Sequence, residues 1–288
     1  MVRPARTARE SSQFEPKIES ISPWCNSAGK RAWDMFWAGL LLIVFSPLML
    51  AVALAVKLTS KGPILFRQSR PGRNAQEFSI LKFRTMVVNR HQDGPVLTRA
   101  FDPRVTWLGR HMRRWKLDEL PQLFNVLRGD MSFVGPRPQP TRLWKEPFIR
   151  QDAAVVLSVR PGITSQATLV FRNEEEVLAP LSCDQVEEVY VRTLMPLKLK
   201  MEIQYLCSAS FLGDMRIVLR TVGRVFNRRE HEDDLLKECL PATNGSQIQE
   251  PKESWKASKL SPWPLLSEVE DVSNMSASSA PSEESRGT

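Results

Sequence analysis

The sequence predicts an α+β, mostly helical, monotopic membrane protein with a re-entrant helix–break–helix and interfacial amphipathic helices. The chain of 288 residues has room for one or two domains. Its one strongly apolar stretch runs from Ala32 to Val56 and is interrupted in the middle by Ser46 and Pro47. Both flanks of this stretch are basic, and shorter extended and helical patterns follow it.

Composition and charge narrow the class of protein. Hydrophobic residues make up 42% and charged residues 25% of the chain, which excludes collagen-like, coiled-coil and fully disordered sequences. The net charge of +8 predicts an anionic partner. Residues 57–150 hold 19 basic and 7 acidic residues, whereas residues 230–288 hold 5 basic and 12 acidic residues. The middle of the chain is therefore a polycation that precedes a weakly anionic tail.

Cysteine and histidine usage argues against a disulfide framework and against a zinc site. The cysteines form no closely spaced pair, and only three histidines are present. We expect reduced thiols in ordinary packing, and we expect any metal to be a hard cation on carboxylates and phosphates. The four cysteines are Cys25, Cys183, Cys207 and Cys239.

The N-terminal region divides into an arm and a membrane segment. Residues 1–27 are polar and predict a flexible arm without a signal peptide. The apolar stretch that follows has 25 residues, and a bilayer crossing needs about 20. Pro47 cannot donate to the carbonyl of Ile43, so the helix should kink or break there, and the Ser46 hydroxyl is one candidate partner for the freed carbonyl.

The basic flanks favour a hairpin for residues 28–60. Lys30 and Arg31 precede the apolar stretch and Lys57 and Lys61 follow it, and basic residues prefer the cytoplasmic side of a membrane. Both flanks reach that side if the segment enters, turns at Ser46-Pro47 and leaves on the same face. A kinked spanning helix and a buried core helix remain as alternatives.

The next segments alternate between extended and helical patterns. Residues 62–86 predict two short extended segments around a turn at Pro71-Gly72. Residues 104–116 predict a basic amphipathic helix, which suits either an anionic membrane surface or a solvated face over a protein core. A second helix is expected over residues 118–127, where Gly129 would stop it.

The second half of the chain contains stiff loops, two helices and a tail. Repeated prolines in residues 132–164 predict loops. Residues 184–211 and 214–228 predict helices, the first interrupted near Pro196. Residues 230–288 are rich in Ser, Glu and Pro and predict a disordered acidic tail, which is either simply solvated or a partner-binding segment.

Adjacent carboxylates at Asp118 and Glu119 are the strongest candidates for chemistry. In one interpretation Asp118 caps the next helix and Glu119 favours its dipole. In the other, one carboxylate attacks phosphorus and its neighbour holds Mg²⁺ on a diphosphate, while nearby Arg and Lys offset the developing charge. We expect Asp118 to be ionised near neutral pH, because the surrounding cations favour the carboxylate.

The order of motifs over residues 28–228 resembles the bacterial sugar transferase family, the monotopic phosphoglycosyl transferases. The resemblance is carried by segments throughout this region, of which the 22-residue block is the most specific: Lys30-Arg31 with Asp34, Ser46-Pro47, Lys61-Gly62-Pro63, Phe66-Arg67-Gln68, Lys82-Phe83-Arg84-Thr85-Met86, LDELPQLFNVLRGDMSFVGPRP and Arg160-Pro161-Gly162-Ile163-Thr164. Only about 28 residues precede the match, so we expect the short form of the family.

The resemblance implies an enzyme that moves a sugar-1-phosphate from a UDP-sugar to undecaprenyl (polyprenyl) phosphate, releases UMP and starts exopolysaccharide, O-antigen or other glycoconjugate synthesis. It places a cytoplasmic catalytic domain at residues 61–229, at the cell inner membrane, among inner membrane lipids. Mg²⁺ is the implied cofactor, and downstream glycosyltransferases are further candidate partners.

The resemblance also assigns roles to individual residues. Asp118 is implied to be the nucleophile of a phosphosugar–aspartyl intermediate, with Glu119 as the other member of the catalytic pair and the metal ligand. Substrate phosphates are implied to contact four basic residues, Lys82, Arg84, Arg113 and Arg137. Ser46 and Pro47 set the membrane break, and Lys30 with Asp34 anchors the start of the helix.

One departure from the family pattern and two rival functions bear on this interpretation. Ser165, Gln166 and Ala167 stand where the family often has Gly and Ala-Gln, so the sugar-side loop leaves the donor sugar undetermined. A membrane-anchored basic binding module would explain the charge but not the paired carboxylates. A nucleic-acid protein is disfavoured because no DNA- or RNA-reading motif is visible, and we expect no nucleic-acid partner.

Overall fold

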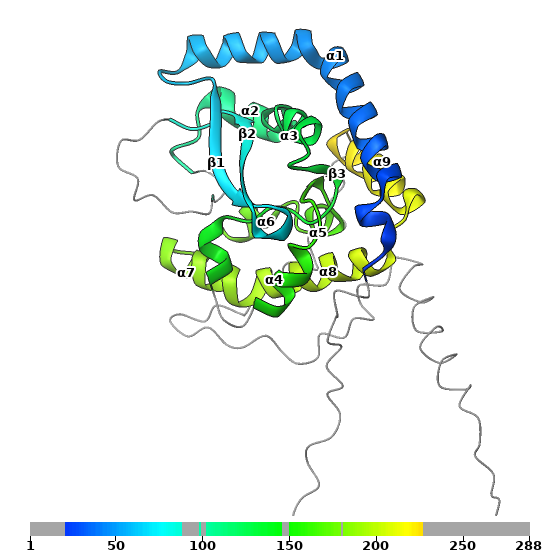
Figure 1. Ribbon diagram of the computed structural model, residues 1–288. Helices are drawn as coiled ribbons and strands as arrows, with labels where there is room; N and C mark the ends of the chain where they lie inside the picture. The colour runs from blue at the N-terminus through cyan, green and yellow to red at the C-terminus, as the bar shows by residue number, and fades with distance from the viewer. Residues whose placement is uncertain (1–20, 88–97, 99–101, 146–149, 180, 227–288) are drawn as a thin grey trace, which may run out of the picture. The chain divides into compact units, whose positions relative to one another are not determined.

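The structure is a computed structural model that describes residues 21–87, 98, 102–145, 150–179 and 181–226. In this part of the chain helices dominate and two small two-stranded sheets lie among them, so the predicted α+β, mostly helical class is confirmed (Figure 1). The predicted acidic tail, residues 230–288, lies outside the described residues. In chain order the elements are η2 (Pro23–Asn26), α1 (Ala28–Thr59), β1 (Leu65–Pro71), η3 (Arg73–Ala75), β2 (Glu77–Phe83), α2 (Trp107–Arg114), η4 (Leu117–Glu119), α3 (Gln122–Arg128), β3 (Ser132–Val134), η5 (Thr141–Lys145), α4 (Arg150–Val156), β4 (Gly162–Thr164), α5 (Gln166–Val170), α6 (Glu174–Val177), α7 (Cys183–Val189), the π-helical turn η7 (Tyr190–Leu194), α8 (Met195–Ser208) and α9 (Phe211–Phe226).

Helix α1 is bent in the middle, so that it forms two limbs (Figure 1). Pro47 is the proline inside this helix, and a proline is the usual cause of so sharp a bend. Ser46 Oγ donates a hydrogen bond of 2.8 Å to the carbonyl oxygen of Ile43, the acceptor that Pro47 leaves without its helical donor. The helix is therefore kinked at Pro47 but continuous, and the predicted partner for the freed carbonyl is confirmed.

Both ends of α1 are fixed to the same folded body. Near its start, Arg31 donates from its guanidinium to the carbonyl oxygens of Val126 and Leu127 at the end of α3, over 2.6 Å and 2.9 Å. Near its end, Val52 and Val56 pack in a cluster with Phe83 and Met112. The bend therefore returns the chain to the body that it left.

The middle of α1 is apolar and exposed. Ile43, Leu50 and Leu58 are each more than 70% exposed, at 74%, 73% and 76%. Among the described residues, α1 is the helix that is long and apolar enough to cross a bilayer. The alternative of a buried core helix is wrong, because a core helix would bury these side chains, and the exposed apolar surface indicates contact with lipid.

Strands β1 and β2 form an antiparallel hairpin with a continuous register from Leu65 opposite Phe83 to Pro71 opposite Glu77. The turn between them contains Asn74 and Ala75 at positive φ. This confirms the two extended segments that the sequence predicts around Pro71-Gly72. The hairpin presents Lys82, near the end of β2, toward the carboxylate of Glu119.

The described part of the proline-rich region 132–164 contains more regular secondary structure than predicted. Strands β3 and β4 pair in parallel within it, with Ser132 opposite Gly162 and Val134 opposite Thr164. The two backbones approach so closely that a Cβ atom at Gly162 would lie 2.2 Å from the amide nitrogen of Gly135. The expectation of loops alone is wrong here, because these glycines allow a backbone pairing that a local pattern does not reveal.

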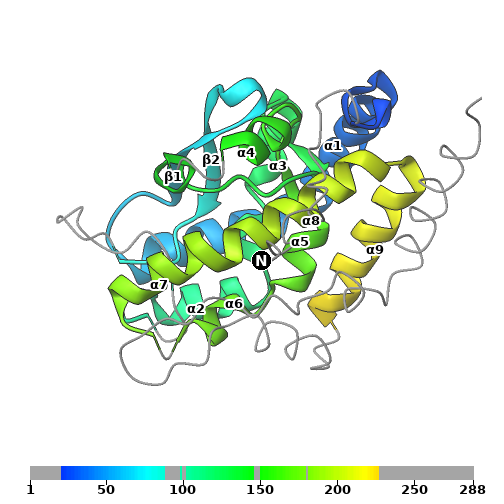
Figure 2. The ribbon, with the colours of Figure 1, turned by 90° about the horizontal axis from the view of Figure 1, so that it is seen from below.

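The two helices predicted over residues 184–211 and 214–228 are present, whereas α5 and α6, which also follow β4, were not predicted. α7, η7 and α8 form one long run with a π-helical turn just before Pro196, and α9 follows it (Figure 2). The start of the chain packs onto this run, because the amide of Ser22 donates to the carbonyl oxygen of Leu206 over 2.9 Å and Cys25 is buried. The predicted flexible arm over residues 1–27 therefore extends too far: Ser22 and Cys25 belong to the folded body.

Candidate active site

Asp118 and Glu119 lie in the tight turn η4 between α2 and α3. Lys116, just before this turn, has a φ of 56°, a left-handed conformation that is unusual for a residue with a side chain. Such strained backbone is often found at functional sites. Helix α3 begins only after Pro121, and no side chain among the described residues caps it, so the interpretation of Asp118 as a helix cap is wrong.

Two cations from distant segments hold the Glu119 carboxylate. Its Oε1 accepts hydrogen bonds from Lys82 Nζ over 2.9 Å and from Arg137 Nη2 over 2.8 Å. Lys82 comes from β2, and Arg137 follows β3. Burial by itself would raise the pKa of Glu119, but the charges of Arg137 and Lys82 outweigh it and hold the pKa well below its usual range. Glu119 is thus an ionised, oriented carboxylate.

Asp118 has a different environment from its neighbour. Its side chain is buried, and within the described part of the chain no group donates a hydrogen bond to its Oδ1. Burial raises the pKa of Asp118, and the charge of Glu119 raises it further, against the opposing charges of Lys82 and Lys116. The cations favour the carboxylate form of Asp118, as expected, but the effects of burial and of Glu119 on its pKa are larger than theirs.

Of the other two predicted substrate-binding residues, Arg113 is close enough to Asp118 to affect its pKa, whereas Arg84 binds elsewhere. Arg113 forms an ion pair with Glu175. The guanidinium of Arg84 is buried and donates to the carbonyl oxygens of Pro63 and Ser60, with the latter bond at 2.7 Å. These contacts attach the end of α1 to β2 and give no support to a substrate-binding role for Arg84.

The predicted anchor residues of α1 are buried in polar contacts. Lys30 forms an ion pair with Asp214 on α9. Asp34 Oδ1 accepts a hydrogen bond of 3.1 Å from the amide of Phe133 on β3. Both contacts join the start of α1 to the body that carries the carboxylate pair.

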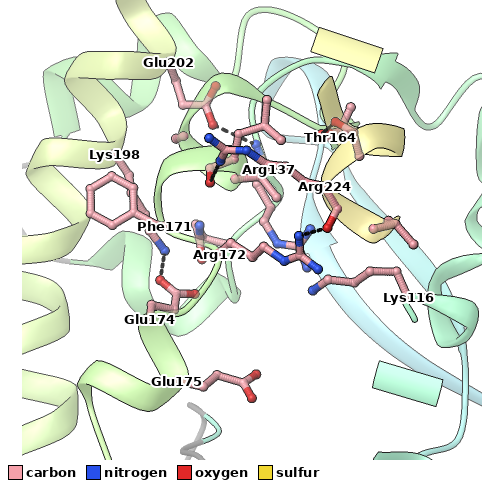
Figure 3. Close-up of a pocket in the computed structure, with 16 residues that line it drawn as sticks. Lys116, Arg137, Thr164, Phe171, Arg172, Glu174, Glu175, Lys198, Glu202 and Arg224 are labelled. Atoms are coloured by element: carbon pink, nitrogen blue, oxygen red, sulfur yellow. Dashed lines mark hydrogen bonds and ion pairs between the residues drawn. The ribbon is translucent and has the colours of Figure 1, made fainter. Parts of the chain in front are cut away.

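A pocket lies beside the pair, and Lys116 and Arg137 line it (Figure 3). Sequence reasoning missed most of its residues, because they come from β4, α5, α6, α8 and α9, which are far apart along the chain. The polar lining residues to which the sequence assigned no role are Gln139, Thr164, Thr168, Arg172, Glu174, Glu175, Lys198, Glu202, Thr221 and Arg224. For Lys198 and Glu202 a weak signal was present, since their spacing of four places them on one face of α8.

The donor groups at the pair fit Mg²⁺ when a substrate completes the coordination. Among the described residues, no cluster of three or more His, Cys, Asp or Glu side chains could hold a metal by itself. Mg²⁺ is commonly bound by one or two carboxylates together with substrate phosphates. Glu119 would provide such a carboxylate beside Asp118, and the phosphates of a bound substrate would supply further ligands.

Comparison with known proteins agrees with this geometry. Residues 25–228 match the model of a protein family described as "Bacterial sugar transferase". A UDP-glucose:undecaprenyl-phosphate glucose-1-phosphate transferase of Caulobacter vibrioides is 42% identical over 197 residues, which cover 67% of this chain and 68% of the relative. The exopolysaccharide production protein ExoY of Rhizobium meliloti is 32% identical over 244 residues, which cover 78% of this chain and 97% of the relative.

Other relatives are longer than the matched region. An undecaprenyl-phosphate glucose phosphotransferase of Komagataeibacter xylinus is 37% identical over 214 residues, which cover 72% of this chain but only 38% of the relative. The matched part of this chain contains α1, the carboxylate pair and the adjacent pocket. This match confirms the resemblance that the motifs indicated: the chain belongs to the bacterial sugar transferase family.

Proposed function

We propose that this protein transfers a sugar-1-phosphate from a UDP-sugar to undecaprenyl phosphate, releases UMP and so initiates the synthesis of a polysaccharide or other glycoconjugate. The observation that carries the proposal is the buried pair at Asp118 and Glu119: two cations hold the Glu119 carboxylate, and one oxygen of Asp118 has no hydrogen-bond donor among the described residues. The names of the relatives, which specify UDP-glucose and undecaprenyl phosphate, support the choice of substrates.

The proposed reaction has two displacements at one phosphorus atom. In the first, a carboxylate oxygen of Asp118 bonds to the phosphorus that bears the sugar, and the bond from this phosphorus to the oxygen of UMP breaks. In the second, a phosphate oxygen of undecaprenyl phosphate attacks the same phosphorus and Asp118 leaves. The acyl phosphate formed between the steps keeps much of the transfer potential of the original diphosphate, so the exchange stays reversible.

The side chains around the pair suit this sequence of steps. An aspartate attacks as the ionised carboxylate, and Asp118 lies within the electrostatic influence of Lys82, Lys116 and Arg113. Lys82 and Arg137 orient Glu119 and supply positive charge where phosphoryl transfer develops negative charge. Mg²⁺ bound by Glu119 and the diphosphate would polarise the phosphoryl oxygens.

We further propose that α1 is a re-entrant hairpin in the cell inner membrane and that the catalytic body faces the cytoplasm. The bend, the exposed apolar middle and the attachment of both ends to one body support this topology. The positive-inside rule supports the orientation, because Lys30, Arg31, Lys57 and Lys61 flank the apolar stretch.

Exposed apolar side chains on two amphipathic helices support contact with the membrane surface. Trp107 on α2 is 71% exposed, and its neighbours in the helix include several basic residues. On α9, Leu212 and Leu219 are 76% and 64% exposed. An apolar side chain flanked by basic residues suits the interface of an anionic bilayer.

The first test is UMP release by the full chain in nanodiscs with Mg²⁺ and undecaprenyl phosphate, across a panel of UDP-sugars. We expect release with at least one donor and a loss of at least about 1,000-fold in the Asp118→Asn variant, because an amide is a far weaker nucleophile than a carboxylate. Asp152→Asn, on α4 and outside the pocket, is the matched control and should keep wild-type turnover.

Two outcomes would count against the proposal. Turnover that survives in Asp118→Asn would exclude Asp118 as the nucleophile. Silence with every nucleotide sugar, from folded protein with verified acceptor, would favour a membrane-anchored basic binding module without catalysis.

A further inference from the structure

Glu202 carries a buried polar atom that the residues around it do not satisfy. Its side chain lies on α8, and the residue is only 4% exposed. Oε1 accepts hydrogen bonds from Ser165 Oγ over 2.6 Å and from the amide of Arg137 over 3.4 Å. Oε2 receives no hydrogen bond from any part of the chain that the structure describes. A buried carboxylate oxygen without a donor is costly, and either a proton on the carboxyl group or a ligand that donates a hydrogen bond to Oε2 relieves that cost.

This carboxylate lines the pocket next to the catalytic pair. Arg137 connects the two, since its side chain binds Glu119 while its amide binds Glu202. Figure 3 shows Glu202 and Thr164 toward one end of the pocket and Lys116 toward the other, with Arg137 between them. A group bound against Glu202 would therefore lie next to Arg137, the same residue that contacts the catalytic pair.

The surroundings of Glu202 suit a neutral ligand with hydroxyl groups. The hydroxyl-bearing side chains of Thr164, Thr168 and Thr221 line the same pocket. Another carboxylate of the pocket, Glu174, is already paired with the buried Lys198, whose ammonium also donates to the hydroxyl of Tyr190 over 3.0 Å. Of these two acids, Glu202 is the one with a buried oxygen available for an incoming O–H.

The cationic end of the pocket suits the anionic diphosphate of a nucleotide sugar. Lys116 and Arg172 line it, and Lys116 directly precedes the turn that carries Asp118. A nucleotide sugar has an anionic diphosphate next to a neutral, hydroxyl-bearing ring. The groups of the pocket follow the same order: Lys116 and Arg172 lie where the diphosphate would bind, and the Glu202 carboxylate lies beyond Arg137, where the sugar ring would bind.

We propose, resting on the proposed function above, that this pocket is the subsite for the sugar ring of the UDP-sugar and that Glu202 Oε2 accepts a hydrogen bond from one sugar hydroxyl group. Glu202 is then a specificity-determining residue, since a UDP-sugar with a hydroxyl group opposite its Oε2 binds more favourably than one without. A sugar that lacks the hydroxyl leaves the buried carboxylate unpaired, and sites of this kind discriminate strongly against such analogues.

The test compares the preferred UDP-sugar with its set of monodeoxy analogues, each of which lacks one hydroxyl of the ring. With wild-type protein in nanodiscs, we expect one analogue to lose roughly 10- to 1,000-fold in kcat/KM, while the others lose much less. In Glu202→Gln, which keeps the size of the side chain, that same analogue should lose less than about threefold relative to the parent sugar. Glu187→Gln is the matched control, on α7 and outside the pocket, and should keep the wild-type pattern.

Inhibition by UMP separates the sugar subsite from the rest of the donor site. UMP has no sugar ring beyond its phosphate, so Glu202→Gln should leave its inhibition constant within about threefold. The proposal would be overturned if Glu202→Gln weakened inhibition by UMP as much as it lowered kcat/KM for the UDP-sugar, because Glu202 would then affect the whole binding site. Equal behaviour of all the deoxy analogues with wild-type protein would also overturn it, and this result needs no variant to fold.

Binding measurements keep this proposal distinct from the proposed reaction. Isothermal titration calorimetry with the same analogues reports the subsite even where no UMP is released. Discrimination among analogues in binding without turnover would contradict the reaction and support the subsite. Turnover without such discrimination would support the reaction and contradict the subsite.

Discussion

Three carboxylates within the site have three different environments, although two of them are adjacent in sequence. Glu119 is held by Arg137 and Lys82, and its pKa lies well below the usual range despite its burial. Asp118 is desolvated and its pKa is raised, first by burial and then by the charge of Glu119. Environments that separate the pKa values of neighbouring titratable groups are typical of catalytic pairs, in which one group is fixed and the other reacts.

Glu202 gives a prediction at the residue scale that concerns stability and pH. Burial raises the pKa of Glu202 to about 7, against the hydrogen bond from Ser165. Because the folded-state pKa lies above the unfolded value, the protonated form stabilises the fold. That stabilisation is complete below about pH 4.5 and is lost as the pH rises through about 7.

The free energy of unfolding of wild-type protein, relative to Glu202→Gln, should therefore decrease by on the order of 3 kcal/mol between pH 4.5 and pH 8. Denaturant unfolding in detergent micelles at a series of pH values measures this difference. Glu187→Gln, at a partly exposed residue, is the control variant for the same series of pH values. A flat difference for Glu202 would show that its burial is not retained in solution.

At the scale of the element, α1 combines a local cause with a distant consequence. Pro47 bends the helix, and Ser46 satisfies the carbonyl that the proline leaves free. The two limbs then depend on different partners, since Arg31 binds the end of α3 and Arg84 binds the backbone at Ser60. The bend sets the direction of the second limb, and these contacts fix where each limb ends.

The Pro47→Ala variant should partly convert the hairpin into a spanning helix. Alanine restores the amide donor to Ile43 and favours a straight helix, which competes with the contacts that fix both ends. The background for labelling is a variant without the native cysteines that keeps Pro47, with a single cysteine introduced at the exposed position Ala28 or Lys61. In sealed vesicles, both cysteines should be labelled from the same side in this background. In Pro47→Ala we expect a measurable fraction labelled from opposite sides.

Pro63→Ala provides the control for this experiment, because Pro63 lies after α1 and before β1. It should leave the labelling pattern unchanged. Labelling of the two cysteines from opposite sides in the wild-type background would contradict the hairpin and favour the kinked spanning helix.

At the scale of the whole molecule, a buried polar cluster joins the start of the membrane helix to α9. Asp214 accepts hydrogen bonds from Trp24 Nε1 over 2.9 Å and from the hydroxyl of Tyr205 over 2.6 Å, and it forms an ion pair with Lys30. The side chains of Lys30 and Asp214 are 6% and 1% exposed. Removing one member of so buried a pair leaves an uncompensated charge.

We expect Lys30→Met to lower the free energy of unfolding by about 3–5 kcal/mol, as denaturant titration in micelles would measure. Arg142→Met is the control, since the Arg142–Glu187 pair is largely exposed and should cost at most about 1 kcal/mol. The double variant Lys30→Met with Asp214→Asn should recover part of the loss. Equal losses in the buried and the exposed pair would contradict the role of the cluster.

The sequence by itself determined the features that depend on local composition and on ordered motifs. A run of apolar residues with an internal proline predicted the bent helix, because hydrophobicity and a missing amide donor act within a few residues. The motif order indicated the family and the pair at Asp118 and Glu119. The helical run of α7, η7 and α8 and helix α9 followed their patterns, as did the hairpin of β1 and β2.

Tertiary structure alone decided which side chains surround that pair. Arg84 and Arg137 both lie in basic motifs, yet one binds backbone carbonyls at the end of α1 and the other binds Glu119. Glu202 reaches the site through Ser165 and Arg137, which are 37 and 65 residues away along the chain. Such contacts depend on how helices and strands pack in three dimensions, and burial then sets the pKa of each carboxyl group, which local sequence patterns do not encode.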